Sequence, residues 1–156
     1  KKKKKGEGGL SLKTNSKLHD KFALEYVISG RNAVSYYGLC SFDSNAECLE
    51  CNEIANRNLN PYFNNLIFVN ESEPEDIVLG NSGVRYASLN KALVDYFDNA
   101  YDDSAIDEIF DSMSDEQVKS FKQYLEIKKI TSFDNRDIRI NTIINEAMKN
   151  RISESN

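Results

Sequence analysis

The pattern of apolar and polar positions predicts a strand, a tight turn and two helices in the first part of the chain. A run of β-formers at 26–28 stops at Ser29-Gly30, and a two-turn helical pattern over 30–37 ends at Gly38. Ser29 suits the N-cap, where its hydroxyl accepts a bond from a free helix amide, and Gly38 suits the position after the last turn. Helical spacing of apolar residues predicts a second helix over 46–57.

Three short strands are predicted next. The apolar run at 65–70 is bounded by Asn residues and an acidic turn, and two further β-rich runs occupy 75–80 and 83–87. The last two runs are separated by Asn-Ser-Gly, so we expect them to pair as a hairpin.

The second half of the chain has helical periodicity. Ser88 is placed to cap one helix, and Ser114 with Gln117 forms a capping-box pattern before another. The helices are expected over 89–100, 104–113, 115–127 and 136–151. This order predicts an α+β fold, with a small, mostly antiparallel sheet packed with several helices and a helical C-terminal half.

Length and composition fit one domain with an extension. The chain has 156 residues, of which 40% are hydrophobic, enough for a single core. We predict a flexible basic tail or hinge over 1–16, an α/β domain over 17–100, and a helical extension over 101–156 packed on the same core. No apolar run approaches the roughly 18 residues of a membrane helix. Three cysteines make an odd number for a disulfide framework, so we expect a cytoplasmic protein without membrane association.

Charge is unevenly spread along a chain whose net charge is −5. A block of five lysines, Lys1, Lys2, Lys3, Lys4 and Lys5, opens the sequence, whereas residues 95–116 are strongly acidic. The basic block is a candidate for contacts with nucleic acid or an anionic partner. The alternative is a solvated tail, because blocks of like charge are typical of disordered segments.

Candidate chemistry in the sequence is sparse. Cys40, Cys48 and Cys51 lack the fourth soft ligand of a zinc site, and the one histidine, His19, is distant in sequence, so we expect packed thiols and no metal. No phosphate-binding glycine motif occurs, and we expect no cofactor and no catalytic residue.

One enzymatic alternative remains, a nucleotidyltransferase fold, active or degenerate. In that fold a strand, a small-residue turn and a helix precede a magnesium-binding carboxylate pair. Here Ser29-Gly30 would be the phosphate site. Asp43 and Asn45 stand where the two acids are expected, so the second acid is missing.

Three segments together resemble a known family. They are YVISGRNAVSYYGL at 26–39, NLIFVN at 65–70 and GVRYASLNKALVDYF at 83–97. This pattern is similar to the C-terminal domain of AbiEi-type antitoxins of type IV toxin–antitoxin systems, over roughly residues 24–130. Lys91, Leu93 and Asp95 occupy the family's recurrent positions. Asn90 stands where the family commonly has an acid, and Leu89 where it commonly has proline.

The resemblance implies a non-enzymatic regulator in toxin–antitoxin or phage-defence (abortive infection) systems. Its expected partner is a cognate nucleotidyltransferase toxin. Promoter DNA is a second expected partner, bound through a DNA-binding part not evident here. Beside the lysine block, Arg31, Arg85 and Lys91 are the candidate partner- or nucleic-acid-binding residues. Lys91 opposes the dipole near the start of its predicted helix, so we expect it to be held there for a partner or for an acidic neighbour.

Overall fold

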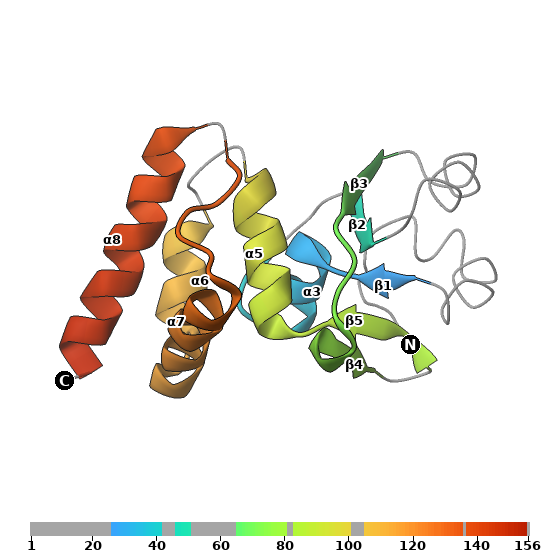
Figure 1. Ribbon diagram of the computed structural model, residues 1–156, viewed down its shortest axis with the longest axis horizontal. Coiled ribbons are helices and arrows are strands. Elements are labelled where there is room, and N and C mark those ends of the chain that lie inside the picture. Colours follow the sequence, from blue (N-terminus) through green and yellow to red (C-terminus); the bar gives the residue numbers. More distant parts are fainter. Residues whose placement is uncertain are drawn as a thin grey trace.

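The computed structural model describes residues 26–41, 46–50, 65–80, 83–100, 105–135 and 137–155. In Figure 1 a small twisted sheet stands at one end, helices α3 and α5 lie against it, and α6, α7 and α8 extend away at the other end. The α+β class and the helical C-terminal half predicted from the sequence are therefore confirmed. The predicted basic tail, 1–16, lies outside the described residues.

The described strands form a mixed five-stranded sheet with the order β3-β2-β1-β5-β4. Two neighbouring pairs, β1 with β2 and β4 with β5, are antiparallel, and two, β1 with β5 and β2 with β3, are parallel. The sheet is thus evenly mixed, and the prediction of a mostly antiparallel sheet is wrong in this respect. The parallel pairs require crossover connections, which local periodicity does not reveal. The strand bounds are β1 Val27–Ile28, β2 Ala46–Glu50, β3 Asn65–Val69, β4 Ile77–Leu79 and β5 Arg85–Ala87.

The structure contains strands where three were predicted, but it contradicts the helix predicted before them. β3 lies within the predicted strand at 65–70, and β4 and β5 pair as the expected antiparallel hairpin. The helix predicted over 46–57 is wrong in its first part, since 46–50 is β2, and its remainder lies outside the described residues. β2 is hydrogen-bonded on both sides, by β1 and β3, and this pairing overrides the local helical spacing.

The Ser29-Gly30 turn opens α3 (Gly30–Tyr36) in an unexpected way. Ser29 occupies the N-cap position, but its side chain makes no capping bond, so the predicted cap is wrong. Gly30 has φ +55°, a left-handed conformation that favours glycine and turns the chain sharply from β1 into the helix. Gly38, with φ +82°, ends the helix as predicted.

Helix α5 (Leu89–Asn99) lies at the centre of the molecule, between the sheet and the C-terminal helices (Figure 1). The Ser88 hydroxyl accepts a bond from the Lys91 amide at 3.3 Å, which confirms the predicted cap. α5 packs closely against α3, and Leu93 and Phe97 are fully buried. This helix therefore joins the sheet to the helical half.

The remaining described α-helices are α6 (Ile106–Ser112), α7 (Asp115–Lys128) and α8 (Ile138–Ser155), and a short 3-10 helix, η1 (Pro74–Asp76), precedes β4. The capping box of Ser114 with Gln117 is confirmed at the start of α7. The apolar residues on both sides of the predicted boundary at residue 100 belong to one core, in which the Phe97 ring contacts three other phenylalanine rings. Those rings are Phe110, Phe121 and Phe133, with centroids 5.8, 6.0 and 5.2 Å away.

Polar contacts fasten the helical half to the sheet side. Asp76, which is buried, accepts bonds from the Tyr124 hydroxyl of α7 at 2.9 Å and from the Ser88 hydroxyl at 3.1 Å. Burial, and then the bond to Asp76, raises the pKa of Tyr124 well above its ordinary value. Among the described helices, none combines the length and apolar character that crossing a bilayer requires.

Candidate functional site

A buried network of charged and hydroxyl side chains lies where the sheet meets α5. Ser29 follows β1, Glu50 ends β2, Ser72 follows β3, and Lys91 and Asp95 lie one turn apart on α5. Four separate segments of sequence therefore supply one cluster. Ser29, Glu50, Lys91 and Asp95 are each at least nine-tenths buried.

Lys91 is at the centre of this network. Its ammonium donates to Asp95 Oδ2 at 2.5 Å and to the Asn70 carbonyl at 2.8 Å, and it lies 3.4 Å from Glu50 Oε1. An ammonium has three donors, and here each one meets an oxygen. The structure therefore supplies the acidic neighbours that the position of Lys91 on its helix called for.

Hydroxyl groups complete the coordination of both carboxylates. The Ser29 hydroxyl donates to Asp95 Oδ2 at 2.5 Å. Glu50 accepts from the Ser72 amide at 2.7 Å and from the Ser72 hydroxyl. Each carboxylate is thus bound by one cation and at least one further donor, which is what makes buried charge tolerable.

The network holds two carboxylates and one cation. Burial raises the pKa of the Asp95 carboxyl, and the nearby Lys91 charge and the bonds from Lys91 and Ser29 oppose that rise. Burial likewise raises the pKa of the Glu50 carboxyl, against the opposing bonds from Ser72 and the charge of Lys91. Lys91 is the ammonium that compensates both groups, so removing it leaves buried negative charge.

The geometry of this network is suited to holding the sheet against α5, because its polar groups already bond one another. Ser29 is completely buried, and its hydroxyl proton points to a carboxylate rather than to an open space. The ammonium of Lys91 is saturated by its three acceptors. Across the described ranges, no three His, Cys, Asp or Glu side chains gather as metal ligands.

The structure places the candidate partner-binding residues on different elements. Lys91 lies inside the network, whereas Arg31 on α3 and Arg85 on β5 are half-buried and nearer the surface. Lys1, Lys2, Lys3, Lys4 and Lys5 lie outside the described residues, as does Asp43. A partner role for Arg31 and Arg85 stays a prediction.

Sequence reasoning missed Glu50 and Ser72 as members of this cluster. Glu50 was concealed by the wrong helix, and Ser72 lies in a short acidic loop with no local signal. Glu50 could have been assigned to the cluster only if 46–50 had been recognised as a strand, because that strand brings Glu50 to Lys91. Cys40 is packed as expected, and burial raises the pKa of its thiol to about 12.

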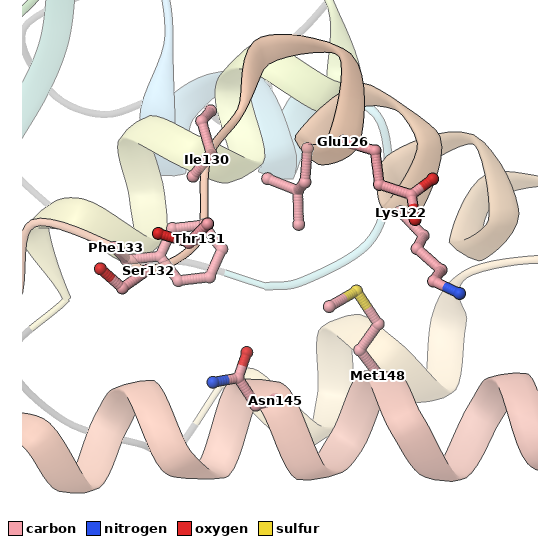
Figure 2. Close-up of a pocket in the computed structure, with 9 residues that line it drawn as sticks. Lys122, Glu126, Ile130, Thr131, Ser132, Phe133, Asn145 and Met148 are labelled. Carbon is pink, nitrogen blue, oxygen red and sulfur yellow. The ribbon is translucent and has the colours of Figure 1, made fainter.

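A second candidate is a hollow of about 180 Å³ between α7, the α7–α8 link and α8. Figure 2 shows Met148 and Asn145 rising from α8, with the link residues on one side and Lys122 and Glu126 of α7 on the other. Its volume is below the roughly 300 Å³ at which small-molecule sites begin. The lining is Lys122, Leu125, Glu126, Ile130, Thr131, Ser132, Phe133, Asn145 and Met148. The lining combines apolar and polar side chains without a converging set of reactive groups.

Comparisons with protein-family models, with curated proteins and with solved structures found no match for this chain. The buried network and the segments that form it are therefore the basis for a functional proposal.

Proposed function

We propose that this chain is an antitoxin-like regulatory protein of a bacterial toxin–antitoxin or phage-defence system. It neutralises a nucleotidyltransferase-type toxin in the cytoplasm, without catalysis of its own. Repression of its own promoter is a second role, through a DNA-binding part other than the described fold.

One observation carries the proposal. The first and last of the three segments that resemble AbiEi-type antitoxins meet in the buried network. Ser29 of the opening turn donates to Asp95, and Asp95 pairs with Lys91, both from the Lys-x-Leu-x-Asp segment. The intervening Leu93 is fully buried. The residues that carry the resemblance thus have a shared structural task, which is expected if they define a common fold.

The alternative was a transferase with a phosphate at the Ser29-Gly30 turn. A carboxylate, that of Asp95, already occupies the place in front of the Ser29 hydroxyl. A phosphate brought there would meet like charge in a buried setting, which is strongly unfavourable. The buried Asp95 carboxylate therefore favours the non-enzymatic proposal.

The direct test is neutralisation of a toxin in cells. The reading frame next to this gene is identified first, and a neighbour that encodes no nucleotidyltransferase counts against the proposal. A nucleotidyltransferase found there is induced in a bacterial host, alone or with the full chain, and growth is followed. We expect rescue by the wild-type chain and reduced rescue by a variant with Arg31→Ala and Arg85→Ala. A matched control, Lys119→Ala with Lys122→Ala on exposed α7, should rescue fully. Failure of the wild-type chain to rescue growth, despite soluble expression, would refute the proposal.

A second assay addresses catalysis. The purified chain is incubated with magnesium, each labelled nucleotide, and bulk RNA or protein. No transfer is expected. Label transfer that disappears in Asp43→Ala would establish the transferase alternative.

A further inference from the structure

Within the part of the chain that the structure describes, the hydrogen-bonding register of β4 leaves one edge of the sheet open. The Gly80 amide donates to the Val84 carbonyl, and the Ser88 amide donates to the Asp76 carbonyl, both at 2.7 Å. Val78 pairs with Tyr86 between these two bonds. Because bonding alternates along an antiparallel pair, residues 76, 78 and 80 face β5, and Ile77 and Leu79 face away from it.

Four main-chain groups of β4 therefore point away from β5, and three of them are unpaired within the described residues. The Ile77 amide is used by the Pro74 carbonyl, but the Ile77 carbonyl and both groups of Leu79 have no hydrogen bond within the described part of the chain. β4 is the last strand in the sheet order, at the edge seen in Figure 1. Unpaired groups of this kind are a template for an added strand.

The side chains of β4 do not protect this edge. Proteins commonly block an open edge with lysine or proline, and β4 has neither. Val78 is 40% exposed and Leu79 is 70% exposed. Beside them Tyr36, also exposed, stacks on Tyr86 with 3.8 Å between ring centroids. The edge thus offers main-chain bonds together with apolar contact area.

The charge beside the edge indicates what kind of strand would bind. Glu71, Glu73 and Glu75 are exposed in the segment that leads into β4. A strand pairing antiparallel with Ile77–Leu79 continues past Ile77 towards this acidic segment. Lysine or arginine there would gain attraction and faster association.

We propose that the free edge of β4 binds an extended, lysine- or arginine-bearing segment of another protein as an added strand. Its apolar side chains lie against Val78 and Leu79, and its basic end lies beside Glu73 and Glu75. Three residues of edge are too short for a stable self-dimer, which needs more than about 1,000 Å² of buried area. The proposal is independent of toxin neutralisation.

The test uses a fluorescent synthetic peptide, TVTVTKKK, and a matched peptide in which the three lysines are glutamates. Anisotropy with the full chain should show saturable binding of the first peptide only, weakening as salt rises from about 50 to 200 mM. Amide spectra should shift at Ile77 and Leu79. Equal binding of the two peptides, or no binding up to millimolar concentration, would overturn the proposal.

A proline substitution isolates the edge hydrogen bond. Leu79→Pro removes the outward amide without removing a bond to β5, and proline is tolerated on edge strands. Its matched control, Leu79→Val, keeps the amide. We expect Leu79→Pro to bind the lysine peptide about five- to tenfold more weakly than Leu79→Val, the effect of losing one hydrogen bond. Equal affinities would contradict strand addition.

Three further measurements test for misfolding and for other occupants of the edge. Glu73→Gln with Glu75→Gln removes two exposed charges, of which Glu75 also lies 3.8 Å from the Lys128 ammonium at the surface. Weaker peptide binding is expected with little change in thermal stability, because exposed ion pairs contribute little. Unchanged binding would count against the proposal. Concentration-dependent self-association through β4 would overturn the proposal and show that a second copy of this chain occupies the edge. Hydrogen exchange would show whether the Leu79 amide is protected in the free chain. Protection that is lost when Lys1–Lys5 are replaced by Gln would overturn the proposal and show that the chain's own N-terminal segment occupies the edge.

Discussion

Replacing Lys91 with methionine should be among the most destabilising single changes in this protein. Methionine fills the space of the aliphatic stem, so the change removes mainly the ammonium. That ammonium bonds Asp95 and the Asn70 carbonyl and pairs with Glu50, and the lysine and acidic side chains are at most 10% exposed. Removing one partner of a buried ion pair costs about 3–5 kcal/mol. A small domain has about 5–15 kcal/mol of stability in total, so a large share would be lost.

The pH dependence gives this prediction its sharpest form. Burial already raises the pKa of the Glu50 and Asp95 carboxyls, and loss of Lys91 raises both further. A carboxyl whose pKa is raised in the folded state stabilises the fold while protonated, below its unfolded pKa. That stability is lost as the pH rises through the folded pKa. The deficit of Lys91→Met relative to wild type should therefore be largest near pH 8 and shrink towards about pH 5.

Urea unfolding followed by circular dichroism at several pH values measures this deficit. The matched control is Lys128→Met, because Lys128 is more exposed and lies 3.8 Å from Glu75 and Asp76. Its cost should be at most about 1 kcal/mol and nearly independent of pH above 6. If Lys91→Met lowers the free energy of unfolding by less than about 1 kcal/mol, by the same amount at pH 5 and pH 8, the ion-paired network is not shielded from water and the reasoning is refuted.

Three further predictions concern the residues around this network. Ser29→Ala should lower the free energy of unfolding by about 1.5–3 kcal/mol, as expected for a hydrogen bond to a carboxylate. A double-mutant cycle with Asp95→Asn should show coupling, whereas additive costs would mean that the two side chains act separately. Val34→Ala should lower the free energy of unfolding by more than about 1 kcal/mol, because Val34 is fully buried and the change leaves a cavity; a smaller loss would place it outside the core. The Cys40 thiol, whose pKa burial raises to about 12, should resist alkylation by iodoacetamide at pH 8 until the protein is unfolded, and mass spectrometry of the native protein would reveal early labelling if it does not.

Sequence alone was sufficient wherever the structure depends on neighbouring residues. The caps at Ser88 and Ser114, the end of α3 at Gly38 and the β4–β5 hairpin all rest on contacts within a few positions. Such contacts leave a local signature, because a cap or a turn needs a particular side chain or glycine at a fixed offset. The α+β class follows from the elements that these contacts define, although the predicted order was wrong at 46–50, where a helix was expected and β2 is found.

Only the tertiary structure determined the features that depend on partners distant in sequence. Ser29 has the sequence of a helix cap, yet its hydroxyl donates to Asp95, which is 66 positions away, and accepts no bond from a helix amide. Residues 46–50 have a helical pattern, yet pairing with β1 and β3 makes them a strand. That strand places Glu50 against Lys91, 41 positions further along. Burial in the folded chain turns these distant polar residues into obligatory partners, since a charge removed from water must find its counter-charge wherever the fold has brought one.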